Sequence, residues 1–202
     1  MKGMKEASLD PSMRQTVEAL LAGGVVLYPT DTVWGLGCMA GDENALGRLA
    51  LLKQRPAGKS MLVLLAAEAA QPLATNPAVR RLLLESERPT TVVVPAGLGL
   101  VESLVERRWV SPLLLAADGS LGIRVPRTPW IAALLAHLPG ALVSTSANFA
   151  GQPTPTGFDD IDPRLRATVD FCVPNLPQHE GCGAASRLVK VEEGGTVVVL
   201  RD

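Results

Sequence analysis

Aromatic residues are scarce in this sequence, since Phe, Trp and Tyr together make up 3% of its 202 residues. Hydrophobic residues nevertheless reach 47%, so the core must be built mainly from Leu, Val and Ala. Cysteine is also rare, and three cysteines, an odd number, do not form a disulfide framework. We therefore expect a reduced, cytoplasmic protein.

Long apolar runs are missing as well. No run reaches the roughly 18 residues of a membrane span, and residues 1–13 lack the apolar middle of a secretory signal. A formal net charge of -1 excludes the basic coat of a dedicated nucleic-acid-binding protein, although it allows local basic patches. The length predicts one domain, residues 1–202, with a substantial core.

Helices and short strands alternate along the chain, which predicts an α/β fold. Capping residues followed by apolar residues at helical spacing predict helices at 10–22, 42–52, 77–84, 101–106, 128–138 and 163–167. Short apolar runs predict strands at 25–28, 61–65, 91–94, 121–125, 141–143, 168–173, 187–191 and 196–200, the last two forming a hairpin.

Polar residues follow the strand predicted at 25–28. Pro29 removes a backbone donor and ends the strand, which leaves Thr30, Asp31 and Thr32 at its carboxyl end. Ligands of open α/β sheets bind at such strand ends, and the glycines at 35 and 37 allow close approach to the backbone. The alternative is an ordinary polar turn.

A second hydroxyl-rich stretch, residues 144–148, follows the strand predicted at 141–143. The two stretches could line one cleft and donate hydrogen bonds to a carboxylate or phosphate. The alternative is again a turn or a helix cap.

Cations suggest where an anion would bind. Lys53, Arg55 and Lys59 fall within seven residues on a predicted loop, which suits a phosphate clamp or, alternatively, a solvated helix end. Arg124 lies inside an apolar run, so it must be paired, bind an anion, or lie on a solvated edge of the sheet.

Other clusters do not form recognisable sites. Cys172, His179 and Cys182 fit no standard zinc spacing, and His137 suits packing or capping. The acidic residues near 160 suit a solvated turn, so we assign no protein metal site. With no evident acid–base pair, the sequence favours chemistry by positioning and electrostatics.

Four stretches together resemble the YrdC-like family, the threonylcarbamoyl-adenylate synthases. They are YPTDTVWGLG at 28–37, LLKQRPAGKSM at 51–61, LGIRVP at 121–126 and LVSTSANFAG at 142–151. The resemblance covers most of 10–157. It implies a twisted, mixed parallel and antiparallel sheet, flanked by helices around a deep concave cleft.

The resemblance also implies a reaction. L-threonine, bicarbonate and ATP, with Mg²⁺, would give threonylcarbamoyl-adenylate and diphosphate. A separate threonylcarbamoyl transferase would then use the adenylate to modify tRNA, which this chain itself would bind weakly.

The site residues that the resemblance implies fall into three groups. Lys53 and Arg55 would act on the triphosphate as catalytic residues. L-threonine would contact Thr32, Arg124, Ser144 and Ser186. ATP would contact Arg55, Lys59, Ser120, Ser146, Asn148, Thr154 and Arg201.

Two other functions stay open. A non-catalytic RNA- or nucleotide-binding module on the same fold would use local cations such as Arg80, Arg81, Arg107 and Arg108. A carbamoyl-adenylate activity that starts from carbamoyl phosphate is disfavoured, because the companion domains of such proteins are missing.

Overall fold

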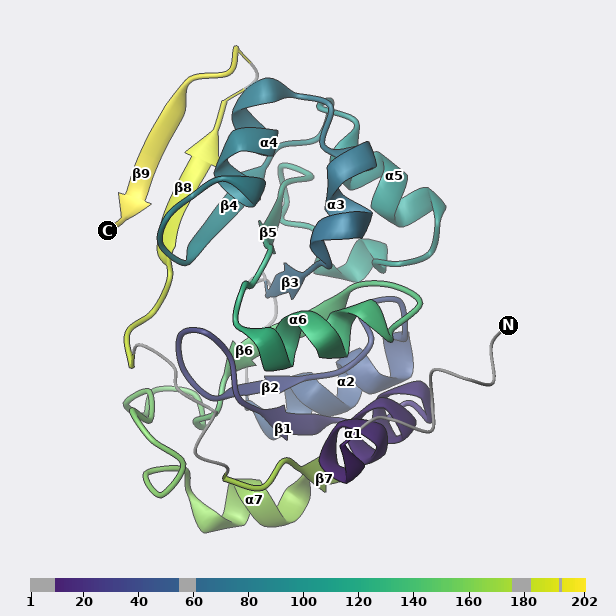
Figure 1. The fold of residues 1–202 in the computed structure, drawn as a ribbon, viewed down its shortest axis with the longest axis vertical. Helices are drawn as coiled ribbons and strands as arrows, with labels where there is room; N and C mark the ends of the chain where they lie inside the picture. Colours follow the sequence, from purple (N-terminus) through teal and green to yellow (C-terminus); the bar gives the residue numbers. More distant parts are fainter. Residues whose placement is uncertain (1–9, 55–60, 176–182, 193) are drawn as a thin grey trace.

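The computed structural model describes residues 10–54, 61–175, 183–192 and 194–202 (Figure 1). Its helices lie close to the predicted ranges, with one addition, α3, which sequence patterns did not predict. Their bounds are α1 (Pro11–Leu21), α2 (Glu43–Leu52), α3 (Ala67–Leu73), α4 (Pro77–Leu84), α5 (Leu100–Glu106), α6 (Pro129–Ala136) and α7 (Pro163–Thr168). None of these helices is long and apolar enough to cross a bilayer.

The strands of the described ranges form one nine-stranded sheet in the order β7-β1-β2-β6-β3-β5-β4-β8-β9. Their bounds are β1 (Val26–Tyr28), β2 (Gly35–Gly37), β3 (Leu62–Leu64), β4 (Thr90–Val94), β5 (Leu121–Arg124), β6 (Leu142–Ser146), β7 (Phe171–Cys172), β8 (Arg187–Val191) and β9 (Val197–Arg201). β3–β5, β4–β8 and β1–β7 are parallel and the other pairs are antiparallel, so the predicted mixed sheet is confirmed.

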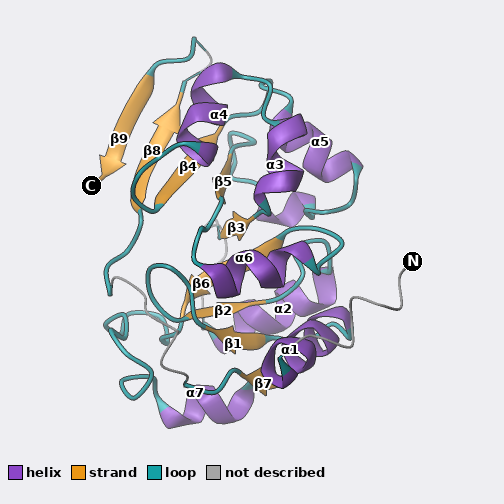
Figure 2. Cartoon of the chain, viewed as in Figure 1, coloured by secondary structure: helices purple, strands orange, loops and turns teal. Residues whose placement is uncertain are grey.

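Helices cover the sheet in two groups (Figures 1 and 2). α3, α4 and α5 lie beside the half that ends in β8 and β9, and α1, α2 and α7 lie beside β1, β2 and β7. The core between these layers is mostly aliphatic, and its largest fully buried side chains are leucines apart from Tyr28 and Ile123. The predicted aliphatic core is therefore confirmed.

Three local predictions were wrong, and one strand, β2 at residues 35–37, was not predicted. The strand predicted at 141–143 continues to Ser146, so its first hydroxyls lie in the sheet. The strand predicted at 168–173 is only Phe171–Cys172. Thr128 occupies the N-cap of α6, but its side chain makes no capping hydrogen bond.

Gly37 is required by close packing between β2 and its neighbours. A Cβ atom at this position would lie 2.0 Å from the carbonyl oxygen of Val143 and 2.8 Å from the Tyr28 hydroxyl. Since the nearest atom belongs to backbone, the sheet itself would have to move.

We predict that Gly37→Ala lowers the free energy of unfolding by about 2 kcal/mol or more, because it overpacks the sheet. Gly47, exposed on α2, is the matched control, since a Cβ there meets nothing within 4 Å. Gly47→Ala should stabilise the protein by roughly 0.5–1 kcal/mol through helix propensity. Urea denaturation measures both, and equal effects of the two substitutions would contradict this account.

Candidate active site

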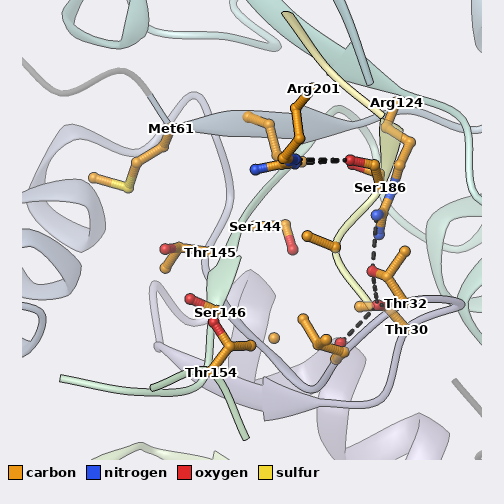
Figure 3. A pocket seen from close by; sticks show the side chains of 14 residues that line it. Thr30, Thr32, Met61, Arg124, Ser144, Thr145, Ser146, Thr154, Ser186 and Arg201 are labelled. Carbon is orange, nitrogen blue, oxygen red and sulfur yellow. Dashed lines mark hydrogen bonds between the residues drawn. The ribbon is translucent and has the colours of Figure 1, made fainter. Parts of the chain in front are cut away.

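The two hydroxyl-rich stretches meet in one cavity of about 230 Å³, as predicted (Figure 3). One wall is the β1–β2 connection and the other is β6, which contributes Ser144 and Ser146. Arg124 from the end of β5, Ser186 just before β8 and Arg201 at the end of β9 also line it. Residues far apart in the sequence thus place hydroxyls and two guanidinium groups around one space.

Arg124 is the most buried charge in this cavity, with 3% of its surface exposed. Its Nη2 lies 3.0 Å from Oδ1 of Asp31, and its Nη1 donates a 2.8 Å hydrogen bond to the Thr32 hydroxyl. β5 lies between β3 and β4, so the alternative of a solvated edge position was wrong. Ion pairing and hydrogen bonding compensate the burial of this charge.

The hydroxyls next to Arg124 form a chain with a defined direction. The Thr30 hydroxyl donates to the Val33 carbonyl at 2.7 Å and lies 2.9 Å from the Thr32 hydroxyl. Because a hydroxyl has one proton to donate, the Thr32 hydroxyl donates to Thr30 while it accepts from Arg124. Both threonines are therefore fixed in orientation before any ligand binds.

The side of the cavity formed by Ser186 and Arg201 is also held by hydrogen bonds within the protein. The Ser186 hydroxyl lies 2.7 Å from that of Thr91 on β4, and Arg201 donates to the Ser186 carbonyl through Nε at 3.2 Å and Nη2 at 2.8 Å. Opposite them, a Cβ at Gly35 would lie 3.2 Å from the Ser144 hydroxyl. Glycine at 35 therefore lets β2 and β6 approach within the cavity.

Lys53 lies behind the cavity wall, 5% exposed. Its ammonium donates to the Ser146 carbonyl at 2.7 Å and to the backbone and side-chain oxygens of Asn148 at 2.5 and 3.0 Å. An ammonium has three N–H donors, so these acceptors occupy all of them. In this geometry Lys53 fixes the segment that carries Ser146.

The remaining predicted ligands divide by position. Thr154 lines the cavity, whereas Asn148 lies beside it and donates to the Gln152 carbonyl. Ser120 precedes β5, at the end away from Arg124, and its hydroxyl donates to Asp118 at 2.6 Å, so it does not line this cavity. Arg55 and Lys59 lie outside the described residues, as do His179 and Cys182.

Sequence reasoning missed one functional contact, the role of Asp31 as the counter-ion of Arg124. A buried arginine needs a counter-ion or a bound anion, and Asp31, in a polar stretch after another strand, was a candidate. The pairing brings together residues 93 positions apart, for which no local pattern exists.

Buried titratable groups near the site do not supply a base. Burial raises the pKa of Tyr28 far above its usual range, and the Tyr28 hydroxyl donates to the Val143 carbonyl. Burial likewise raises the pKa of Cys38 to about 12. The described residues contain no group of three His, Cys, Asp or Glu side chains able to hold a metal.

A second cavity of about 580 Å³ adjoins the first and shares Thr30, Thr32 and Val33 with it. Trp34 and Phe158 line it, with ring centroids 4.9 Å apart in an edge-to-face arrangement. The loop after β6 thus extends the polar cleft with an aromatic surface.

The fold and these cavities define a mixed α/β protein with a polar cleft lined by hydroxyls and two guanidinium groups. The chain belongs to the Sua5/YciO/YrdC family, described as "Telomere recombination", whose match covers residues 18–202. The resemblance stated from the sequence motifs is therefore confirmed.

Relatives and solved structures match most of the chain. A threonylcarbamoyl-AMP synthase of Stenotrophomonas maltophilia is 36% identical over 174 residues, covering 83% of this chain and 86% of the relative. One from Xanthomonas euvesicatoria pv. vesicatoria is 34% identical over 194 residues, covering 93% and 96%. The crystal structure of E. coli YciO superposes with a TM-score of 0.72 at 27% identity, covering 94% of this chain and 88% of that one.

We predict that Lys53→Met lowers the free energy of unfolding by roughly 1–3 kcal/mol, because it removes the three hydrogen bonds that the buried ammonium donates to Ser146 and Asn148. Lys53→Arg should recover part of this loss. Lys190→Met is the control: Lys190 lies 3.6 Å from Asp118 at the surface, and such pairs contribute about 1 kcal/mol or less. Thermal and urea unfolding measure the stability of all three variants. Equal losses for Lys53→Met and Lys190→Met would contradict a structural role for the buried lysine.

Asp160, which lines the second cavity, gives a pH prediction. Hydrogen bonds from the Thr156 hydroxyl and from the amides of Gly157 and Thr156 lower the pKa of its carboxyl. A lowered folded-state pKa means that these bonds are intact above about pH 4 and are lost as pH falls through the depressed value. We predict amide shifts of Thr156 and Gly157 in NMR titrations only below about pH 4.

The control for this titration is a neighbouring carboxylate. Asp160→Asn should shift both amide resonances already at neutral pH and abolish their acid transition, whereas Asp159→Asn should leave both unchanged. If the acid transition of the Thr156 and Gly157 amides persists in Asp160→Asn, another titrating group causes it, and the assignment to Asp160 is wrong.

Proposed function

We propose that this chain is a threonylcarbamoyl-adenylate synthase, which converts L-threonine, bicarbonate and ATP to threonylcarbamoyl-AMP and diphosphate. Family membership supports this, as do relatives of 34–36% identity that carry the name threonylcarbamoyl-AMP synthase. The observation that carries the proposal is the buried Arg124, held by Asp31 and Thr32 and facing a ring of hydroxyls.

The chemistry needs no protein nucleophile. The threonine amine attacks bicarbonate and water leaves, which forms a carbamate. A carbamate oxygen then attacks the α-phosphorus of ATP, the bond to the β-phosphate oxygen breaks, and diphosphate departs. The protein has to hold the reactants in line, stabilise negative charge and exclude water that would hydrolyse the product.

We assign roles to individual residues of the cavity. Arg124 binds the threonine carboxylate, since a guanidinium offers fixed charge-assisted donors, and Thr32 and Ser144 hold the rest of the amino acid. Ser186 contacts threonine, whereas Ser146, Thr154 and Arg201 contact ATP. Arg55 and Lys59 bind the triphosphate in this proposal, and Lys53 holds Ser146 in place.

Mg²⁺ would enter with ATP. Among the described residues, the polar side chains that line the cavity are hydroxyls and guanidinium groups, and the nearby Asp31 is paired with Arg124, so the donor set fits a cation that is held largely by phosphates. Mg²⁺ commonly binds in this way, keeping several waters and using few protein oxygens. Hydroxyl oxygens of the cavity lining such as that of Ser144 would be its protein ligands, and bound Mg²⁺ would neutralise charge on the phosphate oxygens.

The reactivity of the product indicates that a partner protein is needed. A carbamoyl-adenylate is a reactive mixed anhydride, so a second protein must accept it promptly. We assign this role to a threonylcarbamoyl transferase acting on tRNA adenosine, with weak tRNA binding by this chain.

The test is diphosphate release by the purified protein with ATP, bicarbonate and Mg²⁺, with and without L-threonine. We predict threonine-dependent release. Arg201→Gln should raise KM for ATP by about tenfold, because it removes a charged hydrogen-bond donor. The exposed Arg14 on α1 provides the matched control, and Arg14→Gln should leave KM unchanged.

Other outcomes separate the alternatives. ATP binding without any diphosphate release, together with tRNA binding at physiological salt, would favour the non-catalytic binding module. Release that does not depend on threonine would contradict the assigned substrate.

A further inference from the structure

The strand β9 exposes a row of apolar side chains. Val198, Val199 and Leu200 follow one another in the chain and are 40%, 47% and 52% exposed. The other large hydrophobic side chains that the described residues expose lie far apart in the chain, at Leu21, Leu51 and Leu113. Contiguous exposed apolar residues often mark a contact with another protein, so β9 is the strongest candidate for such a contact.

β9 also has an open hydrogen-bonding edge. It is the last strand of the sheet, and among the described strands only β8 pairs with it (Figure 1). The Glu192 amide donates to the Thr196 carbonyl at 2.8 Å, which makes these two residues a hydrogen-bonded pair of the hairpin. Because such pairs alternate with pairs that lack hydrogen bonds, Val198 bonds to β8, whereas Val197 and Val199 direct their amides and carbonyls away from it.

This edge lacks the features that usually prevent strand pairing. Natural edge strands are commonly protected by lysine, by proline, by an inward-pointing charge or by a bulge in the strand. Residues 196–200 read Thr-Val-Val-Val-Leu and contain no charge and no proline. The register shift against β8 falls at Leu200, at the end of this segment, so residues 196–199 form a regular, unprotected strand edge.

We propose that β9 pairs with β9 of a second copy of this chain, antiparallel about a two-fold axis at Val198. Residues that face outward must oppose one another, so Val197 of each copy pairs with Val199 of the other. Val198 then lies opposite Val198 of the other copy. An axis at Val199 would instead pair Val197 with Arg201, across the register shift at Leu200.

The side chains at this edge are self-complementary. Val197 and Val199 lie opposite Val191 and Val189 of β8, which are both buried, so all four lie on the core face of the sheet. The two-fold axis brings Val197 and Val199 of both copies together on that face. Directly opposed β-branched side chains stabilise sheets, and the apolar face continues across the axis from one copy to the other.

Charge complementarity favours the antiparallel arrangement. β9 is preceded by Glu192, which is exposed and has no ion pair or side-chain hydrogen bond with any described residue. At the end of β9, Arg88 and Arg187 both pair with Asp202, and Arg201 adds a third guanidinium. Antiparallel pairing places the acidic start of each strand near the basic end of the other, whereas parallel pairing would place like charges together.

Sedimentation velocity of the whole chain at increasing concentration tests this pairing. A pair of such short strands is smaller than a standard stable interface, so we expect a dissociation constant on the order of 10 µM. Val198→Lys and Val198→Glu should each weaken dimerisation by about tenfold or more, because the axis brings two like charges face to face. An equimolar mixture of the two variants should dimerise again, because the facing charges are then opposite.

The matched controls are Leu113→Lys and Leu113→Glu, at an exposed apolar residue outside β9. Both should dimerise as the unsubstituted chain does. Because Val198 is exposed, its variants should also keep the thermal unfolding midpoint of the monomeric chain, and recovery in the mixture is possible only if both variants are folded.

A chain that stays monomeric at all concentrations would overturn the β9 pairing. Dimerisation that Val198→Lys leaves unchanged, or a mixture of Val198→Lys and Val198→Glu that does not associate, would also overturn it. These measurements use neither ATP nor threonine, so their outcome is independent of the proposed function.

Discussion

Arg124 lies in an interior strand with 3% of its surface exposed, so its charge must be compensated inside the protein. Asp31 and Thr32, from the β1–β2 connection far earlier in the chain, provide this compensation. Removing one partner of such a pair typically costs about 3–5 kcal/mol, because the other charge stays buried. The contact therefore links the β1–β2 connection to β5 and sets the shape of the cavity between them.

Other parts of the site depend on this arrangement. With Arg124 and Thr32 fixed, the hydroxyl chain from Thr32 to Thr30 has one orientation, and the guanidinium lines the same cavity as Ser144 and Ser186 (Figure 3). Preorganised donors of this kind stabilise developing charge without reorganisation at the moment of reaction. A fold with no evident acid–base pair can therefore still perform adenylate chemistry.

Local sequence patterns predicted most helices and strands, because proline, caps and apolar spacing act over a few residues. They missed β2, since Gly35 and Gly37 have low strand propensity and only packing against Tyr28 and Val143 explains them. The convergence of two hydroxyl stretches was also predicted. The three acceptors around Lys53 depend on long-range contacts, which no spacing in the sequence reveals.

The central claim is that the buried Arg124 forms the carboxylate end of a threonine site. A crystal structure of the protein with L-threonine and a non-hydrolysable ATP analogue tests it most directly. The account predicts the threonine carboxylate at hydrogen-bonding distance from the Arg124 guanidinium, with Ser146 beside the nucleotide in the same cavity. Threonine bound elsewhere, or Arg124 in contact with Asp31 and Thr32 alone in the complex, would contradict it.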